Sequence, residues 1–192
     1  MNTQMTEKES LKIIYEMIET SKLNIKGDAI FFLLWGWLVL IASIAHFILE
    51  QMDYAYSFLP WPLMMIGGGI ASGIIGYHMG QRNRTITLID KTMIYLWCGF
   101  FALVVSMIVI TTLGKMSWGV TQPMIVALYS LATFVSGVML RFRPLILGAV
   151  FSWFCAIAIF FVAFPYSQLL IALSIIVSYL IPGYMLKYKR EE

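Results

Sequence analysis

Six stretches of this chain are strongly apolar, contain no Asp, Glu, Lys or Arg, and leave little room for anything else. A helix needs about 20 apolar residues to cross the hydrocarbon core of a bilayer. Because lipid offers the backbone no hydrogen-bonding partner, such a segment must be helical. The sequence therefore predicts an all-α membrane protein with six transmembrane helices. We expect these helices at Ala29–Leu49, Leu59–Tyr77, Met93–Leu113, Val120–Leu140, Pro144–Phe164 and Ser167–Leu186.

Basic residues are divided unequally between the two sides that these spans define. Of the 13 Lys and Arg residues, all but Lys115 lie in the leader, in the links after the second and fourth spans, or in the tail. Positively charged segments stay in the cytoplasm, so both termini are predicted to be cytoplasmic. The net charge of +3 then reflects orientation rather than nucleic-acid binding, because the basic residues sit beside the spans instead of in one patch.

The even-numbered spans end alike, which predicts an internal repeat. Gly137–Arg143 and Gly183–Lys189 both read glycine, any residue, methionine, leucine, basic, aromatic, basic, and Gly76–Arg82 is a looser version. Each pair of spans would form one helical hairpin, and hairpins that run in the same direction are related by an axis along the membrane normal. We therefore expect three tandem hairpins, at about residues 28–84, 93–143 and 144–190, within a transmembrane domain of residues 28–192.

Small residues at helical spacing predict where helices pack closely. We expect the even-numbered spans to lie centrally and the odd-numbered spans to face lipid more. The stripe in the second span favours packing within the chain, and the alternatives are a face for a second copy or the wall of a substrate path. The expected helix-packing residues are Gly69, Gly73, Gly76, Gly80, Gly137 and Gly183.

The first 27 residues predict a cytoplasmic amphipathic helix. Thr6 and Glu9 have the spacing of a capping box, a helix over about residues 7–21 follows, and Gly27 is expected to end it. The apolar face would dock on the bundle or the membrane surface, or bind a cytosolic protein. The residues of that face are Leu11, Ile14, Tyr15 and Ile18.

Residues that carry chemistry are few in the predicted spans. No carboxylate lies at bilayer depth, whereas ion-coupled carriers usually keep one there. The chain has no His-Glu-x-x-His and no P-loop pattern, and Ser72 has no His at matching depth to activate it. We predict no catalytic residue, no cofactor and no enzymatic activity. The set His46, Glu50 and Asp53 is a candidate divalent-cation site, although a hydrogen-bonded interfacial histidine is the favoured interpretation of His46.

Four segments of the chain resemble a group of small, uncharacterised bacterial six-span inner-membrane proteins. These segments are Glu9–Ile14, Leu33–Trp37, Arg141–Ile146 and Ile181–Lys187. The resemblance covers most of the chain, and its motifs are structural. It implies the six-span architecture and a bacterial inner-membrane location, but no activity.

We interpret the chain as a non-enzymatic integral membrane protein with a regulatory or sensory-adaptor role. Most of its interpretable surface outside the bilayer is cytoplasmic, so the N-terminal helix and basic loops would contact a cytosolic protein. The alternative is a small-solute transporter or channel, in which three hairpins surround a path lined by Ser and Gly. The expected partners are the lipid bilayer, a cytosolic protein and a second copy of the chain, with no nucleic acid.

Overall fold

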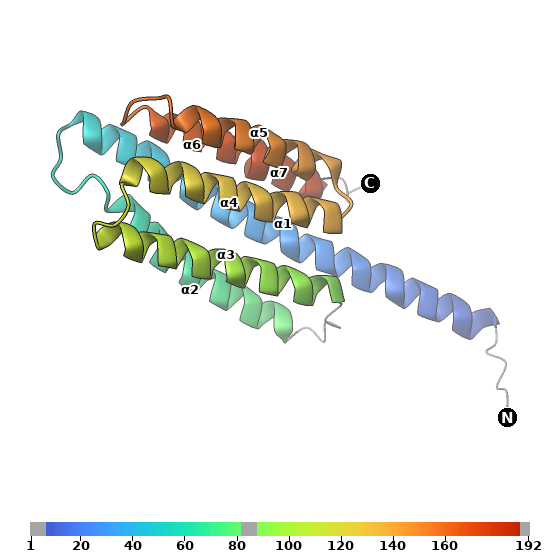
Figure 1. Ribbon diagram of the computed structural model, residues 1–192. Coiled ribbons are helices and arrows are strands. Elements are labelled where there is room, and N and C mark those ends of the chain that lie inside the picture. The colour runs from blue at the N-terminus through green and yellow to red at the C-terminus, as the bar shows by residue number, and fades with distance from the viewer. Residues whose placement is uncertain (1–6, 82–87, 189–192) are drawn as a thin grey trace.

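A computed structural model describes the backbone of residues 7–81 and 88–188 and the side chains of residues 29–81 and 89–188. The regular structure within these ranges is helical, and the helices run roughly alongside one another (Figure 1). In chain order they are α1 (Glu7–Gln51), α2 (Pro60–Gly80), α3 (Leu88–Thr112), α4 (Trp118–Met139), α5 (Arg143–Ile159), α6 (Ser167–Ile175), the π-helical η1 (Ile176–Leu180) and α7 (Ile181–Tyr188).

Five helical segments are long and apolar enough to cross a membrane, so the chain is a multi-pass integral membrane protein. Apolar side chains also cover the outside of the bundle: Ile66, Leu147 and Phe154 are 63%, 69% and 67% exposed. Water would penalise such a surface, whereas lipid does not. The five segments are Ala29–Gln51, Pro60–Gly80, Ile89–Thr112, Trp118–Met139 and Ser167–Tyr188, each within a few residues of a predicted span.

The fifth predicted span is shorter than expected. The sequence predicts a helix through Phe164, but α5 ends at Ile159. Pro165 disfavours a helical backbone at the residue before it, and residues 160–166 turn back toward α6. The 17 residues of α5 extend about 25 Å. That length is less than the roughly 30 Å of a hydrocarbon core, so α5 is not one of the five segments.

Helix α1 is a single element from Glu7 to Gln51, so the predicted helix end at Gly27 is wrong. Glycine disfavours a helix by about 1 kcal/mol relative to alanine but does not exclude it. No proline between residues 7 and 51 interrupts the hydrogen bonds. In Figure 1 the N-terminal part of α1 extends beyond the other helices. The predicted partner face lies outside the described side chains; its residues are Leu11, Ile14, Tyr15 and Ile18.

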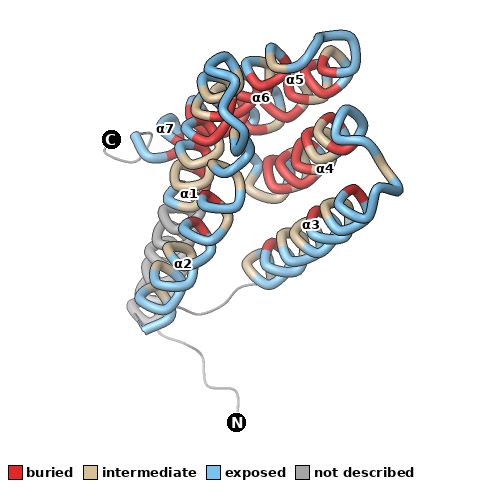
Figure 2. Tube along the Cα trace, turned by 90° about the vertical axis from the view of Figure 1, so that its left-hand side faces the viewer, coloured by how far each residue is buried: buried red, intermediate tan, exposed pale blue. Residues whose placement is uncertain are grey.

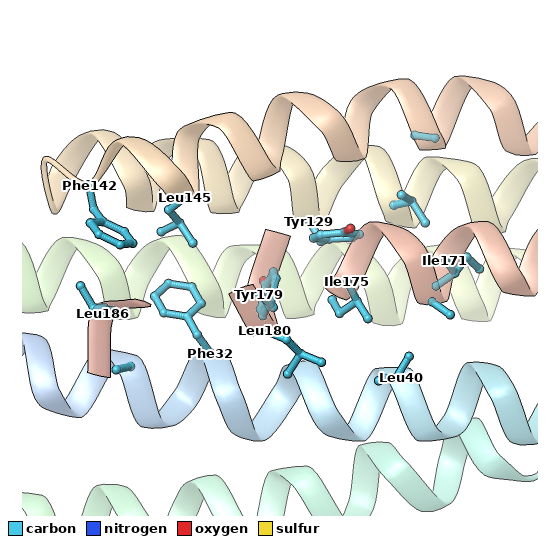
Figure 3. Packing of buried hydrophobic residues seen from close by; sticks show 14 of the residues in the cluster. Phe32, Leu40, Tyr129, Phe142, Leu145, Ile171, Ile175, Tyr179, Leu180 and Leu186 are labelled. Atoms are coloured by element: carbon cyan, nitrogen blue, oxygen red, sulfur yellow. The ribbon is translucent and has the colours of Figure 1, made fainter. Parts of the chain in front are cut away.

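The hydrophobic core lies between α1, α4, α5 and the continuous segment α6–η1–α7; α4 packs on α5, and α6–η1–α7 packs on both α1 and α5. Apolar side chains from all four meet along the length of the bundle (Figure 3). Those at its centre include Phe32, Leu40, Tyr129, Phe142, Leu145, Ile171, Ile175, Tyr179, Leu180 and Leu186.

Helices α2 and α3 lie at the edge of this core. Helix α2 packs on α1, and α3 packs on α4. Met64 and Gly68 are the buried residues of α2, and Met93, Val104 and Thr111 are those of α3 over residues 89–112. In Figure 2, α2 and α3 are mostly exposed or intermediate, whereas buried residues gather on α4 and α6. The prediction that even-numbered spans are central is therefore wrong for α2, while α1 and α5 are central although they are odd-numbered.

Candidate functional site

Six hydroxyl-bearing residues meet where α4, α5 and α6–η1 pack together, and we refer to them as the hydroxyl cluster. All of them are buried. A polar group without a partner is costly in a lipid-embedded interior, so the bonds within this cluster hold its three helices in register. The members are Tyr129, Thr133, Ser152, Ser174, Ser178 and Tyr179.

The Tyr129 hydroxyl is the centre of the hydroxyl cluster. Its oxygen lies 2.8 Å from Ser152 Oγ and 2.7 Å from Ser174 Oγ. Ser174 donates its own proton to the Ile171 carbonyl at 2.8 Å, and Ser178 donates to the Ser174 carbonyl at 2.7 Å. A phenol carries one proton and can accept two hydrogen bonds, so Tyr129 can donate to Ser174 and accept from Ser152.

Tyr179 connects the hydroxyl cluster to α1 and α3. The Thr133 hydroxyl lies 2.8 Å from the Tyr129 carbonyl oxygen and 3.2 Å from the Tyr179 hydroxyl. The Tyr179 ring also packs edge-on against Phe32, Trp97 and Tyr129, with centroids 5.4, 6.3 and 5.7 Å away. Aromatic pairs favour this geometry. One side chain of η1 thus contacts residues of α1, α3 and α4, and its packing depends on all three.

The π-helical turn of η1 has a cause in the sequence. Pro182 lacks an N–H, and its ring clashes with the carbonyl four residues earlier, which belongs to Ser178. In the structure the Ile181 N–H bonds the Ile176 carbonyl, five residues back. The wider turn relieves the clash and lets the helix continue through the proline. Such turns are rare and are frequent at functional sites.

Helix α5 comes into close contact with η1 at Gly148. A Cβ at this position would lie 2.7 Å from Ser178 Cα and 2.8 Å from the Val177 carbonyl oxygen. Atoms do not approach so closely without displacement of the backbone, so only glycine fits. The close approach brings Ser152, one turn further along α5, to the Tyr129 hydroxyl.

His46 packs among aromatic rings near the carboxyl end of α1. It is buried, and Trp61 Nε1 donates to its Nδ1 at 2.8 Å. The Phe164 ring lies 5.4 Å from the imidazole. Among the described residues, no three His, Cys, Asp or Glu side chains are close enough to hold a metal ion. The structure thus does not bring His46, Glu50 and Asp53 together as such a group, and His46 is hydrogen-bonded to Trp61.

Gln168, at the start of α6, holds an unsatisfied polar group in the interior. Its side chain is fully buried, and neither the amide nitrogen nor the amide oxygen has a hydrogen-bond partner in the described part of the chain. Its backbone carbonyl accepts a bond from the Ser43 hydroxyl of α1. Leaving a buried amide without a hydrogen-bond partner costs about 1–3 kcal/mol of folding free energy. Favourable packing around Gln168 must offset this cost.

The predicted helix-packing glycines fall into two groups. A Cβ at Gly137 would lie 2.9 Å from the Ile146 side chain, and one at Gly183 would lie 2.9 Å from that of Leu33. These two glycines therefore sit at contacts between helices. The other four predicted glycines belong to α2, and a Cβ on any of them would meet nothing within 4 Å; they are Gly69, Gly73, Gly76 and Gly80.

Sequence reasoning did not single out Tyr129, Ser152 or Tyr179. The available signal was the four-residue spacing of hydroxyl residues such as Ser174 and Ser178 in the last span. That signal is ambiguous, because Ser and Thr in helices also bond carbonyls of their own helix. Which hydroxyls meet across helices is decided by packing.

No family model matches this chain, and no match is found among curated proteins or among solved structures. Its assignment as a helical, multi-pass membrane protein therefore depends on its own sequence and fold.

Proposed function

We propose that this protein is a non-enzymatic regulatory or sensory adaptor of a bacterial inner membrane. The observation that carries this proposal is the continuity of α1. Its residues Ala29, Phe32 and Leu40 belong to the hydrophobic core, and the same helix continues back to Glu7. A rigid helix moves as a unit, so a change in core packing would be transmitted along α1 to its N-terminal part.

The N-terminal part of α1 would be the surface that contacts a cytosolic protein. Apolar residues there follow an i, i+3, i+4, i+7 pattern, by which an amphipathic helix docks in a groove. The distribution of Lys and Arg supports a cytoplasmic location for this part and for the C-terminus. The contact residues would be Leu11, Ile14, Tyr15 and Ile18.

We further propose that α5 is a sixth crossing. Helix α5 begins directly after α4 ends, and in Figure 1 its connection to α6 lies at the other end of the bundle. It packs against both α4 and α6, which belong to segments long enough to cross. The exposed Phe160 and Phe161 would extend its apolar length beyond Ile159.

Site-specific photo-crosslinking in native membranes tests the adaptor role. A crosslinking residue at Tyr15 should capture a discrete cytosolic protein. The same residue at Glu16, which lies on the polar side of the predicted amphipathic helix, should not. The capture at Tyr15 should also fall when the core is perturbed by Tyr179→Ala. Equal capture from both positions, or no capture from either, would contradict the proposal.

The second candidate function is that of a small-solute transporter. Buried polar groups favour it, namely the hydroxyl cluster and the unpaired amide of Gln168. In this case Gln168→Leu should abolish solute flux into liposomes, while Gln51→Leu, at an exposed position near the end of α1, should leave it unchanged. Flux above that of empty vesicles with this pattern would replace the adaptor proposal.

A further inference from the structure

A cavity opens at the end of the bundle where α4 turns into α5. Its volume is about 540 Å³, and α7 closes one side of it. Its lining combines two basic residues with apolar ones: Arg141, Phe142, Arg143, Pro144 and Met185.

The backbone holds the two arginines in a defined geometry. Arg141 has a positive φ of 51°. Its N–H bonds the Val138 carbonyl at 3.1 Å, and the Phe142 N–H bonds that of Gly137 at 2.9 Å. This pattern caps the carboxyl end of α4. Phe142 is buried and anchors the turn. The backbone positions of its two neighbours, Arg141 and Arg143, are therefore fixed as well.

The cavity is positively charged at one side. Arg141 and Arg143 are exposed, and neither forms an ion pair with a residue that the structure describes. Helix α5 begins at Arg143 and has no acidic residue in its first turn. The amino end of a helix carries a partial positive charge, which adds to the charge of the two guanidinium groups. The site therefore favours an anion.

The other side of the cavity leads onto an apolar strip. Arg143 and Leu147 are four residues apart and share a face of α5. Leu147 is 69% exposed, and Phe154, two turns further along, is 67% exposed. At the same end of the bundle Trp37 Nε1 donates to the Tyr184 hydroxyl at 3.1 Å, and such aromatic residues favour the membrane–water interface. In a bilayer the charged groups would thus lie at headgroup depth, above a surface that faces acyl chains.

We propose that this cavity binds the phosphate of an anionic phospholipid such as phosphatidylglycerol, with its acyl chains on the exposed face of α5. Guanidinium groups donate strong, charge-assisted hydrogen bonds to phosphate oxygens. Basic pockets beside transmembrane helices suit anionic headgroups. A soluble anion would satisfy the arginines but leave the strip of Leu147 and Phe154 unused, so the lipid is the ligand that uses both halves of the site.

Thermal unfolding of the full-length protein in detergent tests this site. Phosphatidylglycerol is titrated, with phosphatidylcholine and inorganic phosphate as separate arms. Arg141→Asn combined with Arg143→Gln removes both charges, and asparagine tolerates the positive φ at position 141. Lys115→Gln is the matched control, because Lys115 lies in the α3–α4 connection at the opposite end of the bundle (Figure 1).

Phosphatidylglycerol should raise the Tm of the wild type and of Lys115→Gln at the same lipid concentration. The double variant should need about thirtyfold more lipid, because two surface charges are lost. If the double variant does not fold, Arg143→Gln alone should need about fivefold more. An equal response of variant and wild type would overturn the site. An equal response to phosphatidylcholine or to inorganic phosphate would overturn the anionic lipid as its ligand.

Discussion

Helix α3, at the edge of the bundle, is more apolar than α4 in its core, yet it is far less buried. Helix α3 has a higher mean hydropathy than α4, but in their most apolar stretches 11% of α3 and 44% of α4 is buried. In water the more apolar helix would be the more buried one. Lipid is as apolar as a protein interior, so in a membrane apolarity does not select the core.

The two regions differ in how their helices are hydrogen-bonded to one another. In the core, the Tyr129 hydroxyl of α4 reaches Ser152 of α5 and Ser174 of α6. At the edge, Ser106 and Thr112 of α3 bond only carbonyls of their own helix, at 2.8 and 2.9 Å. Single pairs join the edge helices to their neighbours, namely Trp35 with Ser72 of α2 and Thr111 of α3 with Thr121 of α4. In the described part of the chain, the hydroxyl network that joins three helices therefore lies in the core, whereas the edge helices are joined to it by single pairs.

The largest effect should follow from a substitution at a close contact in the core. Gly148→Leu would force α5 away from η1, because no space exists beside Ser178 Cα. We expect a loss of about 3 kcal/mol or more in the free energy of unfolding. Denaturation of protein in bicelles by sodium dodecyl sulfate measures this loss.

The matched control is Gly73→Leu at the edge of the bundle. Nothing lies within 4 Å of a Cβ at this position, so the free energy of unfolding should change by less than about 0.5 kcal/mol. If both leucine variants were equally destabilised, the distinction between core and edge would fail.

A smaller effect should follow from removal of one hydroxyl in the core. Tyr129→Phe keeps the ring and deletes the bonds to Ser152 and Ser174. Hydrogen bonds between transmembrane helices are worth about 0.6 kcal/mol on average, so we expect a loss of about 1–1.5 kcal/mol. Tyr95→Phe, on the exposed face of α3, should be neutral in the same assay. A neutral Tyr129→Phe would mean that the hydroxyl cluster does not hold the helices together.

The smallest effect should be seen where an edge helix meets the core. Trp35 Nε1 of α1 donates to Ser72 Oγ of α2 at 3.1 Å. Ser72→Ala should cost about 0.5 kcal/mol, because a single partly buried bond is lost. Ser106→Ala should cost nothing measurable, since the Ser106 hydroxyl bonds only its own helix. If Ser72→Ala lowered the free energy of unfolding as much as Tyr129→Phe, α2 would be bound to the bundle as strongly as the core helices, and the distinction would fail.

Much of the fold was predictable from local patterns. Uncharged apolar runs located five membrane-spanning segments to within a few residues, because helical backbone is the only solution in lipid. The end of α5 was missed, since its apolar run continues past the position where the chain turns toward Pro165. The break at Gly27 was wrong, because a single glycine only weakens a helix. The hairpin repeat and the cytoplasmic location of both termini stay predictions.

The candidate site was far less predictable. Gly137 and Gly183 lie at helix contacts, but the stripe from Gly69 to Gly80 faces no neighbour within the described chain. All these glycines look alike in sequence, because spacing identifies a face of a helix and not the helix opposite it. For the same reason, the hydrogen bond between Tyr129 and Ser152 could not be predicted from the sequence.

By itself the sequence determined that this protein lives in a membrane as a set of helices, because charge-free apolar length and backbone hydrogen bonding leave no other solution. Only the tertiary structure decided that α1, α4, α5 and α6–η1–α7 form the core while α2 and α3 flank it. The physical reason is that lipid and protein interior are equivalent solvents for an apolar side chain. Close contacts between helices, and hydrogen bonds that join several helices, therefore decide which helices form the core.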